Sequence, residues 1–152
     1  MITYQTHLWK VQRKVMSFTH LHVHSHYSLL SGLTKIKELV KTAKKRGFSS
    51  LALTDYGSMY GAIEFYKACH KEGIKPIIGF EAFVAPRKYT DKEIGIDEGD
   101  HRLILLAENY DGYRNLMQLS SAGHLDGLFN GQPRIDKELL QKYADNIIAL
   151  SG

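Results

Sequence analysis

The sequence predicts an α/β fold in which helices cover a sheet of parallel strands, either as an open sheet or as part of a barrel. Segments of strand character alternate with segments of helical period from residue 18 onward. The later strand segments are almost wholly apolar, which is typical of parallel strands buried on both faces. A closed β/α barrel usually needs about 250 residues. If the fold is a barrel, we expect this chain of 152 residues to hold only its first part, truncated before closure.

The first strand is predicted at residues 18–25, FTHLHVHS, where apolar and polar residues alternate strictly. Histidines stand at every second position from His20 to His26, so we expect them on one side of this strand. Residues 87–100 are polar and aperiodic, which predicts a loop. Further strands are expected at residues 49–55, 75–86, 101–108 and 146–152.

Amphipathic helices are predicted between the strands, at residues 34–47, 58–73, 110–124 and 136–144. Gly47 and Gly73 follow the first two, where a residue with positive φ commonly ends a helix. Asp136 is expected to cap the last. The inward faces of the first three helices are expected to be Ile36, Leu39, Val40 and Ala43, then Ala62, Ile63, Tyr66 and Cys69, then Tyr113, Leu116, Met117 and Ser120.

Composition narrows the class of protein. The single cysteine, Cys69, excludes an intramolecular disulfide and is expected to be a small core residue. No apolar run approaches the roughly 20 residues that span a bilayer, and no signal peptide is evident. These features predict a soluble, cytoplasmic protein with no membrane partner.

The net charge of +4 is weak evidence for nucleic-acid binding, because three of the positive charges lie within the first 17 residues. The basic residues 41 and 44–46 are interpreted as the solvated end of a helix, where they oppose the helix dipole. Residues 1–16 show no periodicity, and Met16 is a plausible true start. We expect residues 1–16 to be a disordered or spurious extension and residues 17–152 to be the domain. The alternative is a short strand or helix that packs through Trp9.

Ionisable residues stand at or near the ends of the predicted strands. His24 ends the first, Asp55 and Tyr56 follow the second, and Glu81 lies in the third. In parallel β/α folds the carboxyl ends of strands face the site, so these residues are expected to converge. His101, just before the apolar LILLA, is hard to explain as a core residue. Imidazole and carboxylate ligands suit zinc, manganese or iron, and such ions activate water or clamp a phosphoryl group.

Structural roles remain open for each of these residues. Glu81 could pair with a nearby Lys or Arg, and His101 could cap its strand from solvent. Asp55 could be the N-cap of the following helix. No glycine-rich nucleotide-binding motif and no GxSxG motif is present.

Several blocks of the chain resemble one family in order and spacing: FTHLHVHSHYSLL, LALTD, GAIEFYKAC, GIKPIIGFEAFVAPR, HRLILLAEN, PRIDKELL and IIALSG. This is the polymerase and histidinol phosphatase (PHP) family, and within it the N-terminal domains of bacterial replicative DNA polymerases, the DNA polymerase III alpha subunits. The resemblance implies a partial, distorted, TIM-like β/α barrel of about seven strands. It implies up to three divalent metal ions, zinc, manganese or magnesium, with His22, His24, Glu81 and His101 as ligands.

The resemblance also implies a function. Active members are metal-dependent phosphoesterases, some with 3′–5′ exonuclease activity, and the parent polymerase contacts DNA and other replicase subunits. The alternatives are a non-catalytic structural and interaction module of the polymerase, or a stand-alone PHP phosphatase.

The chain departs from the family pattern at Ser31, where the family has Asp, and at Tyr56, where it has His. Two coordination positions are therefore expected to be lost, and the site to be partial. The sequence ends before the cysteine and the Asp-x-His pair that the family also uses. We therefore expect a fragment that is unstable or oligomeric in isolation.

Overall fold

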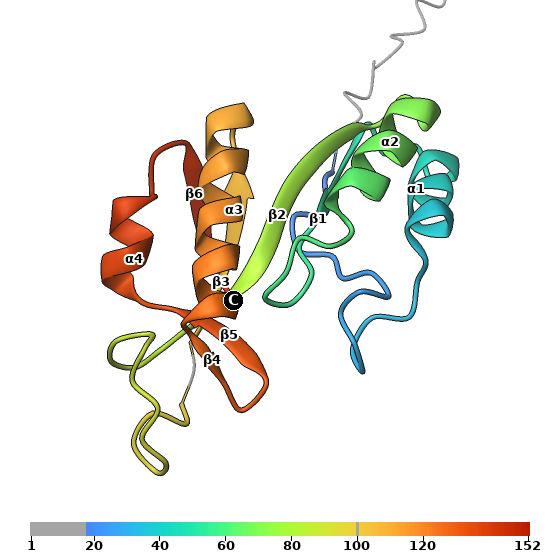
Figure 1. Ribbon diagram of the computed structural model, residues 1–152. Coiled ribbons are helices and arrows are strands. Elements are labelled where there is room, and N and C mark those ends of the chain that lie inside the picture. Colours follow the sequence, from blue (N-terminus) through green and yellow to red (C-terminus); the bar gives the residue numbers. More distant parts are fainter. Residues whose placement is uncertain (1–17, 100) are drawn as a thin grey trace, which may run out of the picture.

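A computed structural model describes residues 18–99 and 101–152 (Figure 1). The predictions for residues 1–16, including packing through Trp9, lie outside the described residues. The helices are α1 (Ile36–Lys45), α2 (Ala62–Glu72), α3 (Tyr110–Leu125) and α4 (Lys137–Lys142). The strands are β1 (Ser50–Leu53), β2 (Lys75–Val84), β3 (His101–Ala107), β4 (Leu128–Phe129), β5 (Gln132–Ile135) and β6 (Ile147–Ser151).

The long strand β2 joins the two halves of the molecule (Figure 1). Its first four residues pair with β1 in parallel, from Lys75 to Ile78. From Gly79 to Val84 it pairs with β3, and its last two residues also pair with β5. Beyond these, β6 lies next to β3 and β4 lies next to β5. The site described below therefore lies on the strand that both halves share.

The α/β class is confirmed, but the expectation of parallel strands throughout is wrong. β3 runs antiparallel to β2, and β6 runs antiparallel to β3. The physical reason is the connection between β2 and β3. Two adjacent parallel strands need a crossover, usually a helix, and residues 87–99 form a loop without a helix or strand, as predicted.

The prediction of a strand at residues 18–25 is also wrong, although the segment lies beside β1. His20 O accepts from Ala52 N at 3.0 Å, and Val23 O accepts from Thr54 N at 2.8 Å. Val23 N–H donates to the Thr54 hydroxyl at 2.8 Å instead of to a backbone carbonyl. The Thr54 side chain thus takes the place of a ladder partner, and no regular strand forms.

Strands β4 and β5 form a hairpin that we did not predict. Its turn is Asn130–Gly131, and both residues have positive φ, 49° and 77°. This is the conformation of a two-residue type I′ turn, for which Asn-Gly is the preferred sequence. The sequence signal was present in FNGQ.

Besides a small apolar cluster of Ala52, Ile104 and Leu106, the described residues form two larger apolar cores. The first is formed by α1, β1 and α2, and the second by β2, β3, α3 and β5. The inward face of α1 is as predicted, and Gly47, Gly73 and Asp136 have their predicted roles at the helix ends. Cys69 is buried, as expected, and burial raises the pKa of its thiol to about 12.

The inward faces of α2 and α3 differ from the prediction because each helix is rotated about its axis. On α2, Phe65 is fully buried, whereas Ile63 and Tyr66 are 56% and 49% exposed. On α3, the buried residues are Gly112, Leu116, Leu119 and Gly123. Small residues on α3 allow close approach, and Gly112 lies directly against the carbonyl of Asn146.

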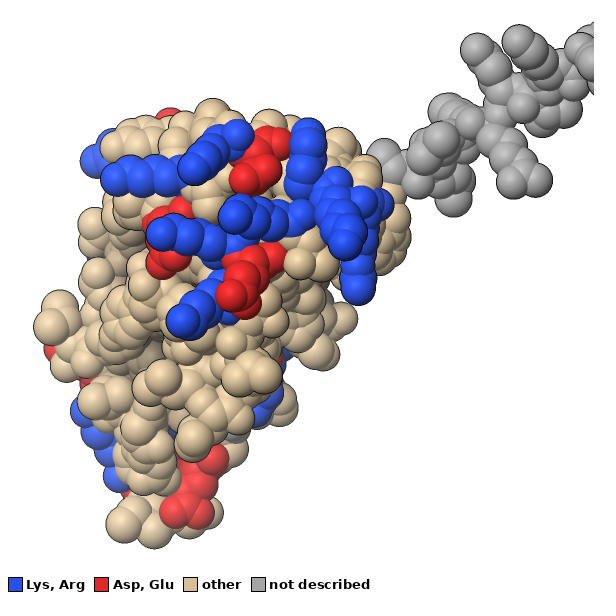
Figure 2. Space-filling view, turned by 90° about the vertical axis from the view of Figure 1, so that its right-hand side faces the viewer, with Lys and Arg blue, Asp and Glu red and all other residues tan. Residues whose placement is uncertain are grey.

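Charge is unevenly distributed over the surface. Figure 2 shows Lys and Arg side chains gathered over one end of the face that it presents. Among the described residues, no helix is long and apolar enough to cross a membrane.

Candidate metal centre

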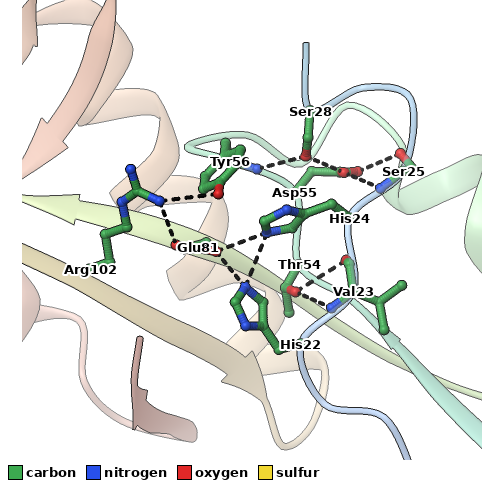
Figure 3. Close-up of polar contacts among 10 residues, drawn as sticks. All are labelled: His22, Val23, His24, Ser25, Ser28, Thr54, Asp55, Tyr56, Glu81 and Arg102. Carbon is green, nitrogen blue, oxygen red and sulfur yellow. Dashed lines mark hydrogen bonds and ion pairs between the residues drawn. The ribbon is translucent and has the colours of Figure 1, made fainter. Parts of the chain in front are cut away.

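Three side chains meet beside the middle of β2: His22, His24 and Glu81 (Figure 3). Glu81 Oε2 lies 2.5 Å from His22 Nε2 and 2.8 Å from His24 Nε2. The two Nε2 atoms are 3.1 Å apart. Glu81 is 2% exposed, His24 16% and His22 44%, so the cluster opens to solvent on the His22 side.

The histidine segment is held in place by a buried carboxylate. Asp55 Oδ1 accepts from Ser25 N and from Ser28 Oγ, both at 2.6 Å, and Asp55 Oδ2 accepts from Ser25 Oγ at 2.8 Å. Asp55 is 1% exposed. It does not cap α2, whose N-cap is Gly61, so that interpretation is wrong. Its role is to fix the chain directly after His24.

Glu81 is positioned by the segment that follows β1. Glu81 N–H donates to Asp55 O at 3.0 Å, and Glu81 O accepts from Gly57 N at 2.8 Å. Tyr56 lies between these bonds and forms an isolated parallel bridge with Glu81. One short segment therefore anchors both the histidine loop, through Asp55, and the carboxylate, through the backbone.

Arg102 also faces the cluster, and sequence reasoning missed it. Its partner across the antiparallel pair is Phe83, two residues from Glu81, so these side chains share one face of the sheet. Arg102 Nη1 lies 3.6 Å from Glu81 Oε1 and donates to the Tyr56 hydroxyl at 3.1 Å. Its guanidinium carbon is 5.0 Å from the centre of the Tyr56 ring. Glu81 therefore presents one oxygen to the histidines and the other to an arginine.

His101 does not belong to the cluster in this structure. It pairs with Val84, and successive residues of a strand point to opposite faces. Its side chain is therefore on the face opposite to that of Glu81 and Arg102. The register of β3 against β2 decides this placement, and the assignment of His101 as a ligand stays a prediction.

Of the two positions that depart from the family pattern, Tyr56 lies beside the cluster and Ser31 lies in a neighbouring groove. The Tyr56 ring packs against His24, with ring centroids 4.1 Å apart. Ser31 and Tyr56 line one groove together with Arg102, and the groove is otherwise lined largely by aromatic and apolar side chains. The Tyr56 phenol thus stands next to the candidate ligands, and the Ser31 hydroxyl lies in the groove beside Tyr56.

The donor atoms fit a divalent ion. Ligands of a tetrahedral zinc ion lie on the order of 3.3 Å from one another, because each is about 2.0–2.1 Å from the ion. The three atoms here are 2.5, 2.8 and 3.1 Å apart. An outward movement of the exposed His22 ring lengthens the two distances that involve His22, and a shift of about 0.5 Å between His24 and Glu81 opens the third.

Comparison with known proteins identifies the family of the chain. A family model described as PHP domain matches residues 20–152. The chain belongs to the PHP domain family. This PHP domain is 52% identical over 138 residues to DNA polymerase III subunit alpha of Treponema pallidum, which covers 90% of the chain and 12% of that protein.

Two further relatives carry the same name. Identity is 49% over 136 residues for the Borreliella burgdorferi protein and 44% over 141 residues for the Thermus aquaticus protein. These matches cover 89% and 90% of this chain. The chain spans about 12% of the length of each of the three relatives.

Two solved structures resemble part of the chain, each with a TM-score of 0.48. One is described as a metal-dependent phosphoesterase from Bifidobacterium adolescentis and is 17% identical in sequence. The matched region covers 67% of this chain and 31% of the phosphoesterase chain. The other is described as an amidohydrolase from Chromobacterium violaceum and is 23% identical in sequence. The matched region covers 68% of this chain and 34% of the amidohydrolase chain.

Proposed function

We propose that this chain is the PHP part of a bacterial replicative DNA polymerase alpha subunit, and that it carries a divalent-metal site of the phosphoesterase type. Identities of 44–52% to three such subunits over about 90% of the chain support the parentage. On this proposal the whole protein is a cytoplasmic DNA-directed DNA polymerase. Its partners are DNA and other replicase subunits, and polymerisation takes place elsewhere in the protein.

The convergence of His22, His24 and Glu81 on one point carries the proposal of a metal site. Two imidazole nitrogens and one carboxylate oxygen suit zinc or manganese better than magnesium, which prefers oxygen ligands and keeps most of its waters. His101 remains part of the proposed ligand set. It would have to turn toward the cluster from the other face of β3.

The surrounding residues suit a phosphoester substrate. A bound divalent ion would polarise a phosphoryl oxygen and lower the pKa of a bound water. Arg102 is 45% exposed and lies next to Glu81, where its guanidinium can neutralise a non-bridging oxygen of the phosphoryl group. The open side at His22 admits the substrate, and the groove beside Tyr56 accommodates the rest of it.

A second candidate function is a non-catalytic module that stabilises the polymerase and binds partners. Arg102 favours this alternative, because it lies against the second oxygen of Glu81 and so opposes further cations there. Ser31 and Tyr56 stand where the family pattern has Asp and His. A site limited to one ion lacks the two-ion clamp that stabilises both the attacking and the leaving oxygen.

Hydrolysis of a 5′-labelled single-stranded DNA, with and without Mn²⁺, separates the two functions. Three proteins are compared: the natural chain, E81Q, and the double variant S31D/Y56H. The phosphoesterase proposal predicts Mn²⁺-dependent shortening from the 3′ end by the natural chain and none by E81Q. If only the double variant S31D/Y56H is active, the result supports the non-catalytic module. Measurable and equal activity of the natural chain and E81Q contradicts the proposed role of Glu81 in both functions.

A further inference from the structure

The strongest concentration of positive charge lies away from the metal cluster, on α1, α2 and the residues that flank them. Among the described residues, 35–75 contain nine Lys and Arg and four Asp and Glu, and one of these acids, Asp55, is buried at the histidine loop. The remaining described residues contain eight Lys and Arg and eleven Asp and Glu. The net charge is therefore +5 on one part and −3 on the other.

The basic residues of this part gather on one face of the molecule. α1 and α2 pack against each other on the same side of the first core, and basic side chains gather where they lie (Figure 2). A groove runs between the two helices, and it is lined by Lys37 and Lys41 from α1 and by Lys67 and Lys71 from α2. We call these four residues the groove lysines.

The groove lysines form two facing rows. Each pair is four residues apart on its helix, which places the two Cα atoms of a pair about 6 Å apart along the axis. Two facing rows of point charges suit a linear polyanion that lies along the groove.

No partner for the groove lysines is found within the described part of the chain. None of the four forms a hydrogen bond or an ion pair there, although Glu64 and Glu72 line the same groove. Glu64 accepts from the hydroxyl of Tyr27 at 3.3 Å, and its charge raises the Tyr27 pKa. Four exposed ammonium groups around one groove repel one another, and this repulsion is relieved by an anionic partner.

We propose that the α1–α2 face is a binding surface for the phosphate backbone of DNA, separate from the metal cluster. Lysine at these positions provides charge without the planar geometry that reads bases, so the contact is expected to be independent of DNA sequence. The choice of DNA among polyanions rests on the proposed function. The presence of a positively charged surface does not rest on the proposed function, because it follows from the groove lysines themselves.

The test measures binding of a fluorescein-labelled 30-base-pair duplex by anisotropy, at several NaCl concentrations and in the presence of EDTA. EDTA removes any contribution of a bound metal ion to DNA binding. A loss of DNA binding in this test is therefore distinct from a loss of metal binding at the cluster. If the four groove lysines neutralise about four phosphates, the slope of log K against log salt is about −3.6. Affinity then falls about tenfold for each doubling of salt.

The variant K37Q/K41Q/K67Q/K71Q is expected to bind at least about tenfold more weakly at low salt, with a slope close to zero. The matched control K88Q/K92Q/K137Q/K142Q removes the same net charge from exposed lysines outside the groove and is expected to keep the natural affinity and slope. Thermal melting by circular dichroism checks that both variants fold. If either unfolds, the pairs K37Q/K41Q and K67Q/K71Q replace the fourfold variant.

Three results would overturn the proposal. The first is no binding by the natural chain at low salt. The second is an equal loss of affinity in the groove variant and the control, which would mean that only total charge matters. The third is tighter binding of a polyglutamate peptide of matched charge, which would assign the face to an acidic protein.

Discussion

At the scale of single residues, Glu81 decides how the cluster is neutralised. Its carboxylate is 2% exposed, and a buried carboxylate is destabilising unless it is paired. One oxygen lies against His22 and His24, and the other lies 3.6 Å from Arg102. Arg102 therefore supplies one permanent positive charge beside Oε1, and the two histidines contact Oε2.

We predict that R102Q binds Zn²⁺ or Mn²⁺ more tightly than the natural chain. A unit charge and a dication roughly 6 Å apart repel by about 1.4 kcal/mol even at the dielectric constant of water, which corresponds to about tenfold in affinity. Isothermal titration calorimetry measures the change. R114Q is the control, because Arg114 is an exposed arginine on α3. Unchanged or weaker metal binding by R102Q would show that Arg102 supports the site instead of opposing the ion.

The convergence of His22, His24 and Glu81 was accessible to sequence reasoning, and the position of Arg102 was not. Alternation placed His22 and His24 on one side, and their separation from Glu81 was bridged by the expectation that strand ends converge. The three side chains lie together as expected, although residues 18–25 form no regular strand. His101 was chosen because it precedes an apolar run and matches the family pattern, and Arg102 was not considered. The register of β3 against β2, which pairs Arg102 with Phe83 and His101 with Val84, decides which of the two neighbours faces Glu81.

At the scale of elements, the loop at residues 87–99 is ordered by side chains rather than by regular structure. Arg87 donates to both carboxylate oxygens of Asp97, at 2.8 and 2.7 Å. The buried Arg134 donates to the carbonyls of Asp97 and Asp91, at 2.5 and 2.7 Å. The loop thus closes around two arginines and connects β2 to β3 without a helix.

Acid should loosen this loop. Hydrogen bonds from Arg87 lower the Asp97 pKa from its usual 3.8 to about 2 in the folded protein. The folded-state value lies below the unfolded one, so the stabilisation is fully present above about pH 4 and is lost as the pH falls through about 2. Amide hydrogen exchange of residues 87–99 measures this, and D97N is expected to show the loosened loop at neutral pH. Equal exchange of D97N and the natural chain would contradict this account.

Asp136 is the second anchor of the same region. Its Oδ1 accepts from Leu139 N at 2.7 Å and caps α4, and its Oδ2 accepts from Tyr89 N at 3.0 Å in the loop. We predict that D136A lowers the free energy of unfolding by about 1–3 kcal/mol, from the lost cap and the unsatisfied Tyr89 N–H. Urea denaturation measures the loss.

The variant D136N is the matched control for D136A. Its amide oxygen keeps one of the two hydrogen bonds, so it is expected to lose about half as much stability. No measurable loss of stability in D136A would show that the cap and the loop contact contribute little.

The order of most elements was predictable, and their directions were not. Apolar content and period indicate a strand or a helix, but a buried apolar strand looks the same in either direction. The informative signal for β3 was the absence of helical period between the two strands, since a parallel pair needs a crossover. The Asn130–Gly131 turn was a second unused signal. The rotation of α2 and α3 depends on neighbours that no local pattern identifies.

At the scale of the whole molecule, β2 joins two cores and carries the site between them. Gly79 marks the change from pairing with β1 to pairing with β3, and a Cβ there would collide with the carbonyl of Leu105. β6 ends the hydrogen-bonded order of strands, so its outer edge pairs with no other strand in the described residues. An unpaired edge is a template for association.

We predict that the isolated chain associates at high micromolar concentration through β6, and that I148K weakens this association. Ile148 lies on β6 and is 43% exposed, and a lysine on an edge strand opposes edge-to-edge pairing. Sedimentation velocity measures the change. I63K, on the exposed side of α2, is the control. A chain that stays monomeric at these concentrations would show that the edge is protected.

The most direct test of the metal site is the metal content of the purified chain after dialysis against Zn²⁺ or Mn²⁺, measured by inductively coupled plasma mass spectrometry. We predict about one equivalent of metal in the natural chain and in the control H70A, and less than about a tenth in H22A/H24A and in E81Q. A natural chain without metal, or an E81Q variant that retains a full equivalent, would contradict the assignment of His22, His24 and Glu81 as its ligands.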